Sequence, residues 1–360
     1  MRVLLATSLS RGGPVEHSLV LAKALSGAGA TVEAICADAE TAARFEAAGA
    51  EPAVIPLRHL GDVAGGARVR KVARRADVVH SQDRRSGLWT RVWPQRKGEV
   101  RVYTAHGLPD PFLPPPIGSS RRPKPRDEVA YRGVDAWLAR RSDAVVVPSQ
   151  FLADELVLRI GYPRRRIEVI PNGIKPQLLD SPGAQVGSIS MLEPVKSLDT
   201  FVRAAGAIVE RRPSTRFSIF GEGSQRDELE GLVRTHRLDE AIEFPGHVPV
   251  HEALATLSVY VLCSLLENCP MSLLEAMGAG VPAVATKVGG VAEIAGDAVL
   301  LVPPRDHEEL AAAVLRLLDD APLATGMAKS ARRRVEENFT AERNAERLLG
   351  LYERLIAARS

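Results

Sequence analysis

The feature that most constrains this fold is a regular alternation of short apolar runs with longer amphipathic segments. In the first half of the chain the apolar runs have the length and composition of buried strands. Segments of helical periodicity lie between them, for example at 16–28 and 149–160. Strands that alternate with helices predict a parallel sheet covered on both faces. The predicted strands are 3–6, 31–36, 53–57, 78–80, 100–104, 144–147 and 167–170.

The pattern restarts after a stretch rich in Pro, Gly and polar residues at 171–185, which we interpret as a linker. A length of 360 residues is also sufficient for two domains. We therefore predict two successive doubly wound α/β domains, with ligands at the carboxyl ends of the strands in a cleft between them. The second set of strands is expected at 186–190, 216–220, 242–244, 259–263, 283–285 and 298–302, and a final amphipathic helix at 341–358.

The charge is divided unevenly along the chain. Residues 1–175 hold 28 Lys and Arg against 18 Asp and Glu, whereas residues 176–360 hold 19 against 26. A basic half favours an anionic partner, although a compositional bias toward arginine would produce the same excess. Aromatic residues make up only 4%, which argues against nucleic acid held by base stacking.

Three cysteines without a C-x-x-C pair argue against a disulfide framework or a zinc ribbon. The longest apolar stretch, 253–266, is too short to span a bilayer. We expect a cytoplasmic protein.

The connection from the first strand to the first helix has the composition of an anion-binding loop. Gly12 and Gly13 follow the first strand, where backbone amides at a helix N-terminus can approach an anion. The loop lacks the G-x-G-x-x-G fingerprint, and a Gly-Gly pair is more often only a tight turn.

The strongest motif is the string LLENCPMSLLEAMGAGVPAVATKVGG, which holds Glu267 and Glu275. We expect Ser272 to cap the helix that carries Glu275. The carboxylates suit vicinal hydroxyls of a ribose or a sugar, because each accepts two hydrogen bonds. The backbone amides before the helix would form a cradle for phosphate or sugar oxygens; they belong to Asn268, Cys269, Pro270, Met271, Ser272 and Leu273.

This string resembles the Glu-x7-Glu segment of glycosyltransferase family 4, whose members are retaining enzymes of the GT-B fold. Other stretches fit the same family in order: YTAHG, DAVVVPSQFLADEL, RRRIEVIPNGI, FSIFGEGSQRDELEGL, IEFPGHVP and NFTAERNAERLLGLYERL. The resemblance spans nearly the whole chain and is dense from Asp143 to Ile294.

The resemblance implies two Rossmann-like domains that face a cleft. Residues 1–172 would form the acceptor side, joined by a returning helix at 341–360, and residues 173–340 the nucleotide-sugar side. The implied activity transfers a sugar from a nucleoside-diphosphate sugar to a glycan, lipid-linked or small-molecule acceptor, as in polysaccharide biosynthesis.

The resemblance also assigns roles to residues. Glu267 and the amides after it would hold the donor sugar, and Glu275 the ribose hydroxyls. His106 would lie against the sugar near the reacting carbon, and Lys196 would contact the diphosphate. The remaining donor-binding residues are Gly12 and Gly13 at the diphosphate, Gly221 and Gly223 beside the nucleotide, and His247 and Val248 at the base.

The chain departs from the family at the start of the second domain. The family pattern G-R-L-x-P-x-K-G is here SMLEPVKS, so Met191 replaces an arginine while Lys196 is kept. Arginine makes bidentate contacts with phosphate that methionine cannot make. A second departure is Asn268 in place of a glycine. Three explanations stay open: another arginine takes the place of the missing one, the activity is low, or the donor is a different one.

No D-x-D motif is present, so we expect no metal and no cofactor other than the nucleotide-sugar co-substrate. The family mechanism implies attack on the same face from which the phosphate leaves, with that phosphate as the base. Two other functions stay open. One is a nucleotide-sugar 2-epimerase on the same fold, and the other is a non-catalytic protein that binds sugar nucleotides.

A basic segment at 65–77 predicts contact with an anionic membrane surface or a lipid-phosphate acceptor. As a helix it would present Arg68, Arg70, Lys71, Arg74 and Arg75, with Val69, Val72 and Ala73 available for the core or the interface. Further basic residues could extend the patch toward the Pro-rich segment 107–126, which is expected at the cleft: Arg84, Arg85, Arg121, Arg122, Lys124 and Arg126. The alternative is a solvated arginine-rich face in an enzyme with a soluble acceptor.

Overall fold

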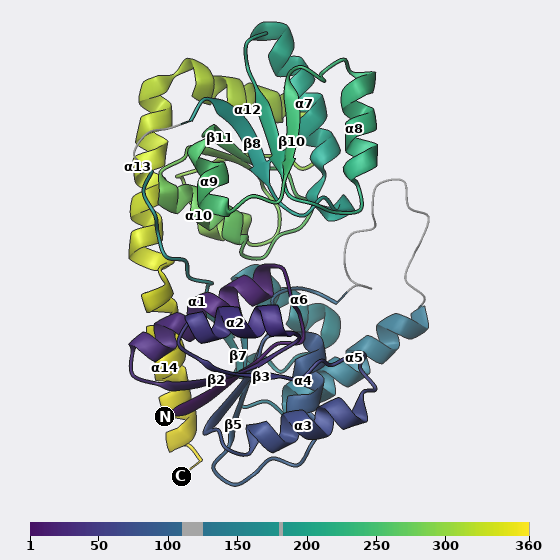
Figure 1. Cartoon of the computed structure of the whole chain (residues 1–360), viewed down its shortest axis with the longest axis vertical. Coiled ribbons are helices and arrows are strands. Elements are labelled where there is room, and N and C mark those ends of the chain that lie inside the picture. The colour runs from purple at the N-terminus through teal and green to yellow at the C-terminus, as the bar shows by residue number, and fades with distance from the viewer. Residues whose placement is uncertain (110–124, 180–182, 360) are drawn as a thin grey trace. The chain divides into compact units, whose positions relative to one another are not determined.

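The computed structural model describes residues 1–109, 125–179 and 183–359 (Figure 1). Most of the Pro-rich segment 107–126 therefore lies outside the described residues. Two compact units are present. The N-terminal unit contains the described residues up to Ile174 together with those from Phe339 onward, and the C-terminal unit contains the described residues from Lys175 to Asn338.

The N-terminal unit is built on a seven-stranded parallel sheet in the order β3-β2-β1-β4-β5-β6-β7. The order reverses direction between β1 and β4, which are neighbours. The strands are β1 Arg2–Ala6, β2 Thr31–Cys36, β3 Glu51–Val54, β4 Val78–Ser81, β5 Val100–Thr104, β6 Ala144–Val147 and β7 Ile167–Val169.

Side chains that alternate along β1 build a core on each face of this sheet. Val3 and Leu5 pack in one cluster with Leu21 of α1 and Tyr352 of α14. Leu4 packs in the other, which includes residues of α3 and α4. The helices of the unit are α1 Gly13–Gly27, α2 Ala39–Ala47, α3 Val63–Ala73, α4 Arg84–Arg91, α5 Pro125–Arg140, α6 Gln150–Glu155 and α14 Ala341–Ala357.

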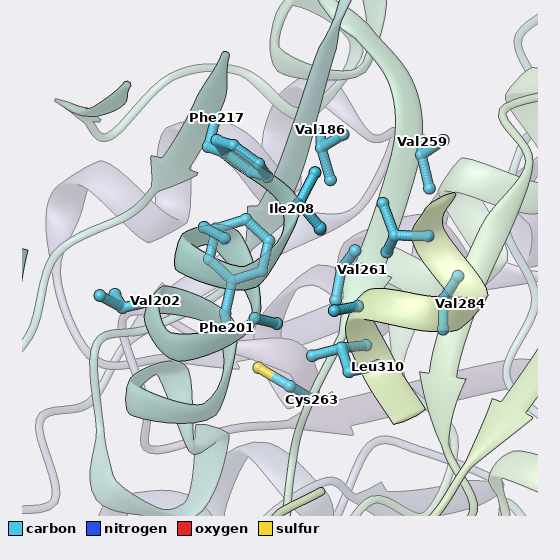
Figure 2. Close-up of a cluster of buried hydrophobic side chains, with 14 of the residues drawn as sticks. Val186, Phe201, Val202, Ile208, Phe217, Val259, Val261, Cys263, Val284 and Leu310 are labelled. Carbon is cyan, nitrogen blue, oxygen red and sulfur yellow. The ribbon is translucent and has the colours of Figure 1, made fainter. Parts of the chain in front are cut away.

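The C-terminal unit repeats the design with six parallel strands in the order β10-β9-β8-β11-β12-β13. Its strands are β8 Gln185–Ile189, β9 Phe217–Phe220, β10 Ile242–Gly246, β11 Leu257–Leu262, β12 Ala283–Thr286 and β13 Leu300–Val302. Its helices are α7 Leu198–Arg211, α8 Arg226–Thr235, α9 Val250–Ala255, α10 Met271–Ala279, α11 Val291–Ala295, α12 His307–Asp319 and α13 Ala321–Asn338. Figure 2 shows Phe201 of α7 and Leu310 of α12 in one cluster with Phe217 and Val261 of the sheet.

The predicted fold class is confirmed, since both units are α/β with wholly parallel sheets. Two local predictions are wrong. The run 53–57 is a strand only up to Val54, because Pro56 has no amide to continue the ladder. The segment 149–160 is not one α-helix: α6 ends at Glu155, and a π-helical turn, Leu156–Ile160, follows it.

The last helix, α14, belongs to the N-terminal unit. The Tyr352 hydroxyl lies 2.6 Å from Nδ1 of His80 on β4, and Arg359 forms an ion pair with Asp143 at 2.5 Å. Asn344 donates to the carbonyl of Pro171 at 2.6 Å. The predicted return of the C-terminal helix to the first domain is therefore observed.

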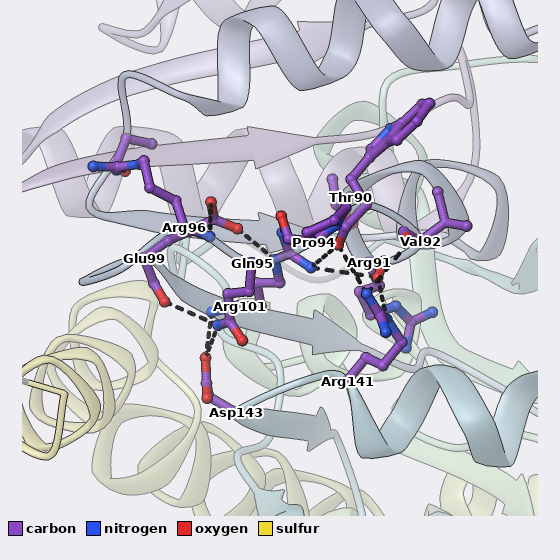
Figure 3. Close-up of polar contacts among 12 residues, drawn as sticks. Thr90, Arg91, Val92, Pro94, Gln95, Arg96, Glu99, Arg101, Arg141 and Asp143 are labelled. Carbon is purple, nitrogen blue, oxygen red and sulfur yellow. Dashed lines mark hydrogen bonds and ion pairs between the residues drawn. The ribbon is translucent and has the colours of Figure 1, made fainter.

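Part of the arginine excess has a structural role. Arg101 is buried, pairs with Glu99 and donates to the carbonyls of Trp93 and Pro94, while Arg141 donates to the carbonyl of Arg91 (Figure 3). These guanidinium groups bind the irregular segment after α4 to the sheet. They are not available to an external anion.

Candidate active site

The candidate donor site lies at the carboxyl ends of β8 and β11. These strands are neighbours, and the chain winds outward from them in opposite directions, so they form the topological switch point of the sheet. Crevices at such points bind ligands in open α/β sheets. Lys196 follows β8 and Glu267 follows β11.

The structure brings Lys196 and Glu267 into direct contact. Nζ of Lys196 lies 2.6 Å from Oε1 of Glu267, and the Ser264 hydroxyl donates to the same oxygen at 2.7 Å. The two loops are joined by a hydrogen bond from the Leu265 amide to the Val195 carbonyl at 2.8 Å. A cation and a hydrogen-bond acceptor are thus held together at the switch point. Their separation of 71 positions hid this contact from sequence reasoning.

Helix α10 begins beside this pair. Pro270 is its N-cap and Met271 its first residue. The first intrahelical donor is the Leu274 amide, which bonds to the Pro270 carbonyl at 3.2 Å, so the amides of Met271, Ser272 and Leu273 have no acceptor within the helix. The predicted cradle of amides from 268 to 273 loses one member, because Pro270 has no N–H.

The predicted capping role of Ser272 is wrong. Helix α10 has no side-chain cap, and Ser272 already lies inside its first turn. Its hydroxyl instead accepts a hydrogen bond from the Tyr260 hydroxyl at 2.7 Å. Burial raises the pKa of Tyr260, and the negative charges of Glu267 and Glu275 raise it further. Glu267 and Glu275 therefore both lie close enough to the Tyr260 hydroxyl to raise its pKa.

Glycines fix the backbone around Glu267. The Gly290 amide donates to the Glu267 carbonyl at 2.9 Å. A Cβ at Gly289, which has φ 52°, would lie 1.9 Å from that carbonyl oxygen. Only glycine fits at this position. Sequence analysis noted the pair Gly289 and Gly290 as part of the motif and gave it no role.

Gly221 and Gly223 also approach backbone closely. A Cβ at Gly221 would lie 1.9 Å from the Ser190 carbonyl oxygen, and one at Gly223 would lie 2.4 Å from that of Leu192. These glycines let the loop after β9 pack on the loop after β8. Their predicted contact with a nucleotide stays a prediction.

Two further predicted positions lie on neighbouring loops. His247 and Val248 follow β10, and the Gly221 amide joins this loop by donating to the Gly246 carbonyl at 2.8 Å. Met191 follows β8 and is 54% exposed. Its side chain fills no core position, so a longer polar side chain would fit there.

In the N-terminal unit, a pocket of about 300 Å³ lies at the carboxyl ends of the strands. Pro14, at the start of α1, and His106, after β5, both line it. Gly12 precedes α1 with φ 97°, which explains glycine there. Pro14 directly follows the Gly12–Gly13 turn, but neither glycine lines the pocket. The predicted contact of Gly12 and Gly13 with a diphosphate stays a prediction.

His106 belongs to a group of three histidines. Its Nε2 lies 3.1 Å from Oε1 of Gln82, and its ring meets that of His17 edge to face, with centroids 5.2 Å apart. Burial, together with the nearby His80, lowers the pKa of His106 to about 3. His106 is therefore a neutral hydrogen-bonding group at neutral pH.

Sequence analysis missed several residues of this pocket. Arg84 pairs with the buried Asp135 at 3.0 Å and stacks over the ring of Tyr131, with its guanidinium 3.8 Å from the ring centroid. Asp83 caps α4 and accepts from the Ser8 amide at 2.6 Å. The only indication in the sequence was the position of Asp83 and Arg84 directly after a strand.

Two doubly wound units of this kind form the GT-B fold. Solved structures share the fold over nearly the whole length. The Anabaena protein HepE, solved with UDP-glucose, is 20% identical, with a TM-score of 0.82 and coverage of 98% of this chain and 99% of that one. Sucrose-phosphate synthase from Thermosynechococcus elongatus is 22% identical, with a TM-score of 0.78 and coverage of 99% and 100%.

The chain belongs to glycosyltransferase family 4. The model of Glycosyltransferase Family 4 matches residues 11–178, and that of Glycosyl transferases group 1 matches residues 171–334. The match to glycogen synthase of Mycobacterium tuberculosis is 35% identical over 57% of this chain and 53% of that protein. The chain is also 26% identical to the 2-deoxystreptamine glucosyltransferase of Streptomyces kanamyceticus, over 62% and 63%. The matched region thus spans about half of the first of these relatives and less than two thirds of the second.

Proposed function

We propose that this protein is a retaining glycosyltransferase that uses a nucleoside-diphosphate sugar. The observation that carries the proposal is the Lys196–Glu267 pair, held at a switch point beside the N-terminus of α10. Positive charge from a lysine and from helix amides suits a diphosphate. The UDP-glucose complex of HepE supports a donor of this class.

In the proposed complex the C-terminal unit holds the donor. Glu267 accepts hydrogen bonds from sugar hydroxyls, and Glu275 from the ribose. Lys196, which contacts Glu267, also faces the diphosphate. The amides of Met271, Ser272 and Leu273 bind oxygens of the sugar or the phosphates.

The proposed reaction is a substitution at the anomeric carbon. The bond from this carbon to the phosphate oxygen breaks, and a bond to the acceptor oxygen forms on the same face. The acceptor proton passes to the departing phosphate oxygen, so the diphosphate leaves with the electron pair of the broken bond. Lys196 and the amides stabilise the charge that builds on the phosphates. We assign no nucleophilic role to Glu267 and propose that no metal is required.

The acceptor is proposed to bind in the N-terminal unit, in the pocket lined by His106. His106 would act there as a neutral hydrogen-bonding group, because its pKa is about 3. Relatives of the chain are named for acceptors as different as glycogen and 2-deoxystreptamine. The acceptor class is therefore proposed only as a glycan, a lipid-linked sugar or a small polyol.

A non-catalytic sugar-nucleotide-binding protein is the second candidate, and Met191 is the observation that favours it. Exposed on the loop after β8, it replaces a cation that would face the diphosphate. Such a protein would bind the sugar nucleotide and transfer no sugar.

A donor screen tests the proposal. UDP-, GDP- and ADP-sugars are added to the full chain, and the melting temperature is recorded. A donor at a hundred times its dissociation constant stabilises the folded state by about 2.7 kcal/mol. Donors that bind are then incubated with and without a mixture of acceptors, and the products are identified. Transfer supports the proposal, a rearranged donor indicates an epimerase, and binding alone favours the non-catalytic protein. Failure of every donor to bind would contradict both candidates.

A further inference from the structure

Helices α3, α4 and α5 form one layer on the N-terminal unit. Gly66 of α3 lies directly beneath Trp89 of α4, where an added Cβ would lie 2.1 Å from the indole. Arg84 of α4 forms an ion pair with Asp135 of α5. Helices α1, α2 and α14 cover the other face of the sheet. We call the solvent-facing side of this layer the α3–α5 face.

The α3–α5 face is strongly basic. Four cations are exposed on α3 and in the turn that follows it: Arg68 and Lys71 on the helix, and Arg74 and Arg75 after it. Residues 58–77, all of which the structure describes, contain two acids. Asp62 is half-buried as the cap of α3, and Asp77 is exposed and accepts a hydrogen bond from the Arg2 amide at 2.8 Å. On α5, Arg132 and Arg140 are exposed. Asp135 of the same helix is buried against Arg84.

Apolar side chains are exposed among these cations. Trp137 and Val134, three positions apart on α5, are 45% and 46% exposed, and Val129 near the start of that helix is 70% exposed. Leu60 and Val63 are exposed at the start of α3. Of the apolar residues of α3 predicted to serve either the core or the interface, Val69 and Ala73 belong to the core, and Val72 packs against it.

We propose that the α3–α5 face docks on an anionic lipid bilayer. Cations beside exposed apolar side chains are typical of helices that lie in a membrane interface, and tryptophan is enriched at that depth. The cations of α3 and of the turn after it lie among the headgroups, while Trp137 and Val134 enter the interfacial region. The described part of the chain contains no helix that is long and apolar enough to cross a bilayer, so attachment through this face is peripheral.

Helix α5 links this face to the pocket. Tyr131 and Asp135 line the pocket, and Val134 and Trp137 of the same helix are exposed. Docking therefore brings the pocket next to the lipid surface. This step rests on the proposed function, and it favours a lipid-linked acceptor whose sugar enters from the bilayer. Membrane docking itself does not require glycosyl transfer, so its test is independent.

Co-sedimentation of the full chain with vesicles tests the docking. One set is phosphatidylcholine alone, and the other contains about one third phosphatidylglycerol. Binding is expected only to the anionic vesicles and is expected to weaken as salt is raised, because salt screens the attraction. Binding to neither set, or equal binding to both, would overturn the proposal. An acidic protein would then be the better partner for this face.

Charge reversal locates the surface. Lys71→Glu with Arg74→Glu is expected to lower the partition coefficient by at least about thirtyfold, since each basic residue contributes a factor of about five. The matched control is Arg203→Glu with Arg316→Glu, an equal charge change at exposed helix positions of the C-terminal unit. A comparable loss in the control would overturn the assignment to the α3–α5 face.

Tryptophan fluorescence reports insertion. The chain has three tryptophans, of which Trp89 is buried, Trp93 half-buried and Trp137 exposed. Brominated lipids in the anionic vesicles are expected to quench the emission of the wild-type protein, and Trp137→Phe is expected to remove most of that quenching. Equal quenching in this variant, with sedimentation unchanged, would overturn the insertion of α5.

Discussion

At the scale of single residues, we propose that Lys196 and Glu267 act as one unit. Because the two side chains touch, removal of either disturbs the other. We expect Lys196→Ala to lower kcat/KM by about 10²–10³, the loss typical of one transition-state donor. Glu267→Gln should lower kcat/KM in the wild-type protein. The same substitution should lower kcat/KM much less in a protein that already carries Lys196→Ala. Steady-state kinetics on the four proteins measure this, and strictly additive losses would contradict the coupling.

Glu275 tests the nucleotide assignment. Glu275→Ala is expected to weaken binding of the nucleoside diphosphate by about 1.5–3 kcal/mol, because the ribose hydroxyls lose a charged partner. Calorimetric titration measures the change. Unchanged affinity in a variant that melts like the wild type would refute the role.

Met191 tests the departure from the family. Since its side chain is exposed, Met191→Arg needs no core rearrangement. If the position is a vacant phosphate contact, the arginine should tighten diphosphate binding or raise kcat by about tenfold. Met191→Gln controls for polarity without charge. A loss of activity in the arginine variant alone would show that another cation already fills this place.

The sequence was sufficient to identify most of these residues but not their contacts. Glu267 and Glu275 could be recognised from one continuous motif. The pairing of Lys196 with Glu267 depends on the adjacency of β8 and β11, which are separated by two other strands in sequence. The cap assigned to Ser272 failed because Pro270 and Met271 start the helix earlier than expected.

At the scale of elements, the loop after β12 supports the loop that carries Glu267. Gly289→Ala is expected to destabilise the protein by about 2 kcal/mol or more, because the new Cβ would overlap the Glu267 carbonyl at a positive φ. Activity should fall as well.

Gly326→Ala is the matched control. It lies in α13, and a Cβ there meets nothing within 4 Å. This variant should be more stable by about 0.5–1 kcal/mol, since alanine favours the helix. Urea denaturation compares the two variants, and equal effects would contradict the packing argument.

Most elements could be predicted because strands buried on both faces form continuous apolar runs. The residues at which strands and helices end were harder to predict. Pro56 shortened the strand at 53–57, and the π-helical turn after Glu155 has no periodicity of its own in the sequence.

At the scale of the whole molecule, buried histidines make folding sensitive to acid. Burial lowers the pKa of His17 and of His80 to about 3, from an ordinary value near 6.5. Their contribution to stability is complete above about pH 6.5. It is lost as the pH falls toward 3, because the unfolded chain binds protons that the folded chain cannot bind.

His17→Phe removes one of the histidines that take up a proton when the chain unfolds in acid. Nδ1 of His17 is buried without a hydrogen-bond partner, and phenylalanine can keep the edge-to-face contact with His106. Between pH 6 and 4, the free energy of unfolding should fall less steeply in the variant, by about 1.4 kcal/mol per pH unit. Denaturation at several pH values measures the slope, and an unchanged slope would contradict the neutral buried state of His17.

The central claim is that this chain transfers a sugar with retention through the group around Lys196 and Glu267. The most direct measurement is proton NMR of the anomeric signals while the protein acts on a donor that binds it, in the presence of acceptors. We predict that the donor signal is replaced by a glycoside of the same anomeric configuration, and that the replacement is slowed strongly in Lys196→Ala. A product of inverted configuration, or equal transfer by the Lys196→Ala variant, would contradict the account.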